Sequence, residues 1–165
     1  MPSNNPAVQF KWSEKYSVGI PEIDEQHKAL FDLIEKIHTA IMEHKGTKAS
    51  TEVLDELVDY TRVHFALEQS LMRMGKYPDY DNHCVLHHDL VAEVVALQEK
   101  VHSGTASISF ELLHFLRNWL AKHILIEDKK YAQFFADHGH ASFSVWANES
   151  NEEIQKQKKK WWKFW

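Results

Sequence analysis

The sequence predicts an all-α protein, an up-down-up-down antiparallel four-helix bundle with an N-terminal arm and a C-terminal extension. Three observations predict this fold. The 165-residue chain has only five glycines, and the four segments between them run for 26 to 34 residues without one. These segments repeat apolar residues at helical spacing, and no strand-like alternation competes with that pattern. Short connections that contain glycine favour antiparallel neighbouring helices.

Glycine and proline indicate where the helices begin and end. Glycine is favoured just past the end of a helix, and proline is favoured at its first position. Pro21 lies two residues after Gly19, so it fits the start of the first helix. We therefore divide the chain into an arm at 1–20, a helical bundle at 21–137 and a C-terminal extension at 138–165.

Each segment carries one narrow stripe of residues that are expected to face the core, with steps of three and four positions. The match is weakest in the second segment, where Thr61 falls on the stripe. The four stripes are Ile23, His27, Leu30, Ile34, Ile37 and Ile41; Leu54, Leu57, Thr61, His64, Glu68 and Leu71; His83, His87, Leu90, Val94, Leu97 and Val101; and Leu112, Leu116, Leu120 and His123.

Composition and charge restrict the class of protein. With 44% hydrophobic and 26% charged residues, the chain has enough apolar material for a packed core. The net charge is −5, but residues 1–155 hold 14 basic and 24 acidic residues, a net charge of −10. An acidic body argues against a nucleic-acid partner, which needs a basic face.

The expected compartment is the cytoplasm. The single cysteine, Cys84, cannot form a disulfide within the chain, and the first residues do not resemble a secretory signal. No stretch approaches the roughly 18–20 apolar residues that cross a bilayer.

Polar residues occupy core positions on all four stripes. Each stripe contains at least one histidine, and Glu68 follows His64 by four residues. Residues four apart lie on one face of a helix, so His64 with Glu68, and His83 with His87, can each direct two donor atoms to one place. Because unpaired burial of such groups is costly, we expect them to meet one another or a shared ion.

The donor atoms favour a transition metal. Imidazole nitrogen and carboxylate oxygen without thiolate fit iron, manganese or zinc, and they argue against a cysteine-rich structural zinc site. The number of candidate ligands suggests two metal ions. Cys84 adjoins His83 but falls about 100° from its stripe, so we interpret it as a packing residue.

Four motifs in order make residues ~10–137 resemble the hemerythrin family, and specifically its single-domain bacterial members. The motifs are Asp24-Glu25-Gln26-His27, His64-x-x-x-Glu68, His83-x-x-x-His87, and His123-x-x-x-x-Asp128 with Tyr131. Each motif alone is weak, but the four together are specific. Two positions depart from the family pattern: Gln69 stands where an acidic residue is common, and Leu90 where phenylalanine is common.

The resemblance implies a pair of iron ions bridged by an oxo or hydroxo group. One iron takes three histidines and the other takes two, while two carboxylates bridge both, so that one coordination place stays open on the second iron. The implied ligands are His83, His87 and His123 for the first iron, His27 and His64 for the second, and Glu68 and Asp128 as bridges.

The function that the resemblance implies is reversible binding of dioxygen as a carrier, store or sensor. In the family, dioxygen enters the open place, takes one electron from each ferrous ion and is held as a hydroperoxide. We see no additional acid–base constellation, so we expect a binding protein and not an enzyme. Two alternatives stay open: an oxygen-responsive interaction or signalling module, and a di-iron oxidase.

One ligand does not follow from simple helix geometry. In an α-helix, Asp128 lies about 140° from His123, whereas Glu127 lies only about 40° away. The family pattern favours Asp128, and we attribute the difference to a carboxylate that reaches across the cluster from the side.

Two further sets of residues carry open interpretations. Phe65, Trp119 and Ile126 flank ligand histidines and, by resemblance, line the oxygen pocket; ordinary core packing is the alternative. A ferritin-like di-iron site would use Glu-x-x-His pairs, which occur at Glu35 and Glu111, but these pairs lie mostly off the stripes.

The C-terminal extension combines basic and aromatic residues. Ser150-x-x-Glu153 matches a capping box, and residues 156–165 then read Lys-Gln-Lys-Lys-Lys-Trp-Trp-Lys-Phe-Trp. Lysine and tryptophan suit an anionic membrane surface. Peripheral membrane attachment through residues 150–165 is the preferred hypothesis; docking on the bundle or on a protein partner, or a disordered tail, are the alternatives.

Overall fold

The computed structural model describes residues 10–139 and 143–162, and all of their regular structure is helical. No helix of the described residues has the length and apolar character that crossing a membrane requires. In chain order the elements are η1 (Glu14–Tyr16), α1 (Pro21–Met42), α2 (Gly46–Met74), α3 (Tyr80–His102), α4 (Phe110–Lys122), η2 (His123–Asp128), α5 (Lys129–His138) and α6 (Phe143–Trp162).

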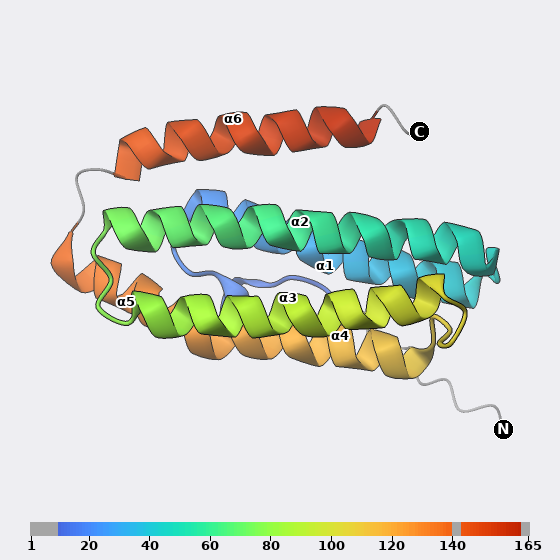
Figure 1. The fold of residues 1–165 in the computed structure, drawn as a ribbon. Helices are drawn as coiled ribbons and strands as arrows, with labels where there is room; N and C mark the ends of the chain where they lie inside the picture. The colour runs from blue at the N-terminus through green and yellow to red at the C-terminus, as the bar shows by residue number, and fades with distance from the viewer. Residues whose placement is uncertain (1–9, 140–142, 163–165) are drawn as a thin grey trace, which may run out of the picture.

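The helices α1 to α4 form the predicted antiparallel four-helix bundle (Figure 1). Helix α1 packs against α2 and α4, and α2 packs against α3. In Figure 1, α5 continues the line of α4 at the end of the bundle where α1 begins. The predicted fold class is therefore confirmed.

The core is built from the predicted stripes. Most of their residues are buried, and the remaining ones, Ile41, Leu90 and Leu97, are partly buried. Thr61 is also buried, because its hydroxyl donates a hydrogen bond of 2.8 Å to the carbonyl of Leu57 one turn earlier. That bond satisfies the only polar side-chain group of Thr61, and so a polar residue fits on the apolar stripe.

The fourth rod of the bundle is not one uninterrupted α-helix. Between α4 and α5 the chain forms the π-helical turn η2, in which hydrogen bonds join residues five apart. Ser109 starts this rod as an N-cap, since its side chain accepts a hydrogen bond from the backbone N–H of Leu112. The sequence predicted the rod but not the π-helical turn.

Residues 10–20, the described part of the arm, lie against the bundle. Phe10 stacks on Phe31 of α1 with 4.3 Å between ring centroids, and Tyr16 and Val18 are buried. The carboxylate of Asp24 accepts a hydrogen bond from the backbone N–H of Val18, which fixes the arm to the first turn of α1.

Helix α6 lies along the outside of the bundle against α1 and α2 (Figure 1). Trp146 and Ser150 are its buried side chains among those described. The capping box expected at Ser150 is wrong, because α6 already begins at Phe143 and Ser150 lies inside it. Apolar docking of the first half of α6, anchored by Trp146, extends the helix past the expected start.

Candidate metal centre

All seven candidate ligands come together in the interior of the bundle. Helix α1 contributes one, α2 and α3 contribute two each, and the two ends of η2 contribute the last two. Each side chain is at most 6% exposed. They form two overlapping groups with donor atoms within 4.8 Å of one another: Glu68, His83, His87, His123 and Asp128; and His27, His64, Glu68 and Asp128.

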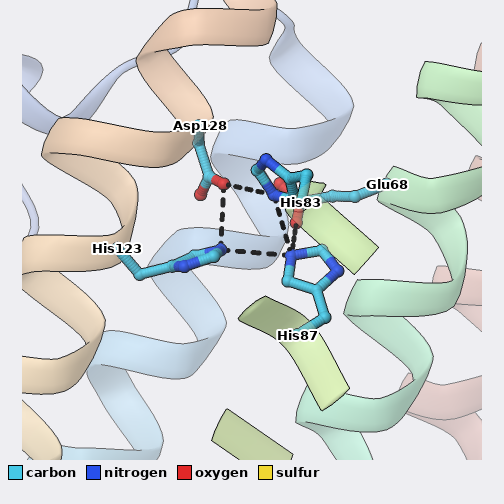
Figure 2. A group of neighbouring side chains, drawn as sticks. All are labelled: Glu68, His83, His87, His123 and Asp128. Carbon is cyan, nitrogen blue, oxygen red and sulfur yellow. Dashed lines mark hydrogen bonds and ion pairs between the residues drawn. The ribbon is translucent and has the colours of Figure 1, made fainter. Parts of the chain in front are cut away.

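Three imidazoles of the first group point their Nε2 atoms at one place (Figure 2). The Nε2 atom of His87 lies 3.0 Å from that of His83 and 3.1 Å from that of His123. Metal–imidazole bonds of about 2.1 Å at right angles would separate two nitrogens by about 3.0 Å. The three nitrogens are thus spaced as neighbouring ligands of one metal ion.

The second group has two imidazoles. His27 Nε2 lies 3.3 Å from Asp128 Oδ2 and 3.7 Å from Glu68 Oε1, and His64 Nε2 lies 3.4 Å from Glu68 Oε2. The rings of His27 and His64 are 4.8 Å apart between centroids. This group therefore offers one nitrogen fewer than the first.

The two carboxylates face both groups. Asp128 directs Oδ1 toward His123 at 3.1 Å and His83 at 3.3 Å, while its Oδ2 faces His27. Glu68 Oε2 lies 3.2 Å from His87 and 3.4 Å from His64. Each carboxylate thus faces imidazoles of both ligand groups and could be shared by two metal ions.

The π-helical turn explains why Asp128, and not Glu127, faces the centre. In a π-helix, residues five apart come onto one face, so η2 aligns Asp128 with His123. Glu127 instead forms an ion pair with Lys130 at 2.7 Å. The attribution of the five-residue spacing to a sideways reach was therefore wrong, because the backbone itself changes its helical period.

Tyr131 and two glutamines contact the cluster from outside. The Tyr131 hydroxyl donates a hydrogen bond of 2.5 Å to Glu68 Oε1. His64 Nδ1 lies 2.7 Å from Gln26 Oε1, and the Gln69 amide lies 3.3 Å from His87 Nδ1. Such contacts fix the orientation of ligand imidazoles. Sequence reasoning gave Gln26 and Gln69 no role, although both adjoin a candidate ligand in the chain.

The imidazoles keep both carboxylates ionised. Burial alone would raise the pKa of Glu68, as would the charge of Asp128, but the surrounding histidines outweigh both and hold that pKa well below its usual range. Burial would likewise raise the pKa of Asp128, and His123, His27 and His83 lower it strongly. Two buried negative charges therefore face the centre.

The buried histidines differ in the direction in which their pKa values shift. Burial lowers the pKa of His64 to about 3 and also lowers that of His87. Burial acts in the same direction on His27, but Asp128 and Glu68 outweigh it and raise its pKa to about 9. A neutral imidazole such as that of His64 has a free lone pair and is ready to bind a metal.

Unpartnered polar atoms test whether a metal fits this centre. Five buried atoms of the candidate ligands lack a hydrogen-bond partner: both ring nitrogens of His27, Glu68 Oε2, and both carboxylate oxygens of Asp128. Buried polar groups are nearly always partnered in folded proteins. Four of these five atoms, His27 Nε2, Glu68 Oε2 and the two Asp128 oxygens, face the other candidate ligands. Metal ions bound there would give these atoms partners, so the residues fit such ions.

Apolar side chains cover part of the cluster. Phe65 stacks on His87 with 3.7 Å between centroids and 4° between ring planes, and its centroid lies 6.1 Å from that of Trp119. Both aromatic residues are buried. Ile126 is 45% exposed, so the expectation that it lines the centre is wrong.

A cavity of about 460 Å³ opens between α2 and α3 beside the cluster. Phe65, Gln69 and His87 form part of its wall, and so does Cys84. A small molecule in this cavity would reach the outer side of His87, where Phe65 and Gln69 contact that imidazole.

The alternative ligand pairs lie elsewhere. Glu35 forms ion pairs with Arg117 and with His38 near the protein surface. Glu111 and His114 are exposed, and His114 contacts Asn118. Neither pair joins a metal-ligand group among the described residues, which argues against the ferritin-like arrangement.

The fold and the donor set define the class of protein first: a four-helix bundle whose buried histidines and carboxylates form two overlapping groups that could hold metal ions. A family model described as the hemerythrin HHE cation binding domain matches residues 18–135. The chain belongs to the hemerythrin family.

Named relatives agree with this assignment. The bacteriohemerythrin of Methylococcus capsulatus is 32% identical over 117 residues, which cover 71% of this chain and 88% of that protein. The myohemerythrin of Theromyzon tessulatum is 30% identical and covers 74% and 90%. The crystal structure of a wild-type hemerythrin has a TM-score of 0.70 at 33% identity, with 74% of this chain and 95% of that chain covered.

Proposed function

We propose that the protein binds dioxygen reversibly at an oxo- or hydroxo-bridged pair of iron ions. The observation that carries this proposal is the pair of overlapping ligand groups that share Glu68 and Asp128. The named relatives, bacteriohemerythrin and myohemerythrin, support it. When bound, two ferrous ions supply the two electrons that reversible capture of dioxygen requires.

The proposed ligands are the seven residues of the cluster. His83, His87 and His123 hold one ion and His27 and His64 hold the other, with both carboxylates shared. The two groups differ by one imidazole, so the proposal puts the dioxygen on the side of His27 and His64. An open coordination position on one ion is the property that separates a binding site from a closed structural site.

The surroundings favour binding over further chemistry. Phe65 and Trp119 are buried beside the cluster and limit the access of water. Burial raises the pKa of Tyr131 well above its usual value, so its hydroxyl keeps its proton and donates to Glu68. We therefore propose an oxygen-binding protein that acts as a carrier, store or sensor, without catalytic turnover.

The test is anaerobic reconstitution with ferrous iron, followed by absorption spectra through cycles of oxygen and argon. The account predicts a spectrum that appears with oxygen and disappears with argon over repeated cycles. Irreversible oxidation in the first cycle would indicate an oxidase, and it would overturn the proposal.

A neighbouring pair of histidines provides the matched control. His87 is a proposed ligand, whereas His88 is exposed on the same helix. His87→Ala should abolish the reversible spectrum, and His88→Ala should leave it unchanged. Equal effects of the two variants would show that the response does not come from the cluster.

A further inference from the structure

The segment at 156–165, which we call the basic aromatic segment, differs in charge from the rest of the chain. It contains five lysines, three tryptophans and one phenylalanine, and it contains no acidic residue. Residues 1–155 carry a net charge of −10. Residues 163–165 of the segment lie outside the described residues, and no described residue of the segment belongs to either ligand group.

The first half of helix α6 is docked on the bundle, and its second half contains the start of the basic aromatic segment. Trp146 and Ser150 are buried where α6 packs on α1 and α2, and the helix continues to Trp162. Lys156 and Lys159 are exposed. Among the described residues, the ion pair that Lys156 makes is with Glu153 of the same helix, and not with the acidic bundle.

We propose that the basic aromatic segment attaches the protein to an anionic phospholipid surface. Each lysine near such a surface adds to the attraction, and tryptophan favours the interface between water and lipid. Stable peripheral attachment needs two signals, and the segment supplies both charge and interfacial aromatic residues. The cytoplasmic leaflet is the anionic surface that the expected compartment offers.

The charge of the body determines the orientation of the bound protein. The acidic bundle is repelled by the surface that attracts the lysines, so contact is confined to the segment and the bundle stays in water. The same repulsion disfavours nucleic acid, because a long phosphate backbone would also meet the acidic bundle. The described contact of Lys156 is with Glu153 of its own helix and not with the bundle.

Co-sedimentation with vesicles tests the proposal on the full chain. The probes are vesicles of phosphatidylcholine alone and of phosphatidylcholine mixed with phosphatidylglycerol. The protein should sediment with the mixed vesicles and should be released by high salt, because salt screens the charges. Each Lys→Gln change in the segment should lower the partition coefficient about fivefold.

Two sets of variants complete the experiment. Lys156, Lys158 and Lys159 are changed together to Gln. The matched control changes to Gln the residues Lys48, Lys100 and Lys122, which are exposed on α2, α3 and α4 of the bundle. The segment variant should lose most binding, and the control should keep it. Trp161→Ser with Trp162→Ser should also weaken binding.

Other outcomes overturn the proposal. Equal recovery of the full chain and of a chain shortened to residues 1–155 would do so, as would equal binding to both kinds of vesicle. Retention on immobilised duplex DNA with no vesicle binding would assign the lysines to nucleic acid. The experiment does not depend on iron, so its failure leaves the proposed oxygen binding untouched.

Discussion

Gln26 holds the buried imidazole of His64 from outside the ligand cluster. Its Oε1 atom lies 2.7 Å from His64 Nδ1, so that nitrogen carries the proton and Nε2 is left free to bind a metal. A single amide in the first turns of α1 thereby sets which ring nitrogen of a residue in α2 faces the centre.

Replacing this amide with an apolar side chain should weaken metal binding without removing a ligand. Gln26→Leu leaves the buried N–H of His64 without an acceptor, and loss of such a partner typically costs about 10- to 100-fold in metal affinity. Competition with a ferrous chelator measures the change. Gln98→Leu, which removes an amide that contacts Asp55 far from the centre, is the control. Equal affinities for both variants would contradict the proposed role.

Two histidines should give the metal-free protein a stability maximum between acid and alkaline pH. His64 has a pKa of about 3 in the folded chain and about 6.5 when unfolded, so its contribution is lost as pH falls below 6.5. His27 has a folded pKa of about 9, so its contribution is complete below 6.5 and is lost as pH rises toward 9.

Urea unfolding of the metal-free protein over this pH range measures the effect. The free energy of unfolding should fall on both sides of the maximum. His64→Gln should flatten the acid side, while His88→Gln, at an exposed position, should leave the curve unchanged. A curve that rises continuously with pH is the result that disagrees with these two pKa values.

At the scale of elements, η2 changes the helical period within the fourth rod. The α-helical period favoured Glu127 as the partner of His123, and only the family pattern favoured Asp128. The structure aligns Asp128 through i to i+5 hydrogen bonding. A π-helical turn has no reliable signal in the apolar pattern, because Leu125 and Ile126 are exposed in it.

The iron content of two variants distinguishes the role of Asp128 from that of Glu127. Asp128→Ala should lose bound iron, because both ligand groups lose a shared carboxylate. Glu127→Ala removes only a surface ion pair with Lys130 and should keep its iron. Metal analysis after reconstitution gives the answer. Loss of iron only in the Glu127 variant would show that the rod is α-helical at this point.

The end of α2 approaches α5 closely at Gly75. A Cβ atom there would lie 2.3 Å from Cε1 of Phe135, although the backbone φ of −78° would accept alanine. Gly75→Ala should therefore destabilise the protein by about 1–3 kcal/mol through overpacking. Chemical denaturation measures the loss. The same change in a Phe135→Leu background should cost less, and an undiminished cost would argue against a steric cause.

At the scale of the whole molecule, the sequence predicted the bundle because its residues agree at every level. The stripes in the four rods bury as expected, and glycines and prolines fall near the helix ends. Six of the seven candidate ligands could be placed in the core for the same reason, since they fall on apolar stripes, whereas Asp128 followed only from the family pattern. Gln26 was not, because one amide beside a ligand gives no periodic signal.

Helix α6 shows that a local capping pattern can predict the wrong start of a helix. Trp146 and Ser150 face the bundle, but the capping pattern at Ser150 pointed to a later start of α6. Local capping preference is weaker than burial of a tryptophan on α1 and α2. Contacts between distant segments therefore decided the length of α6.

Anaerobic titration with ferrous iron tests the central claim most directly, because it counts the ions that the seven inward side chains hold. The account predicts two iron ions for each chain, and removal of either should lower the thermal unfolding midpoint, since the ligands join α1, α2, α3 and η2. A titration that saturates at one ion or fewer for each chain would contradict it.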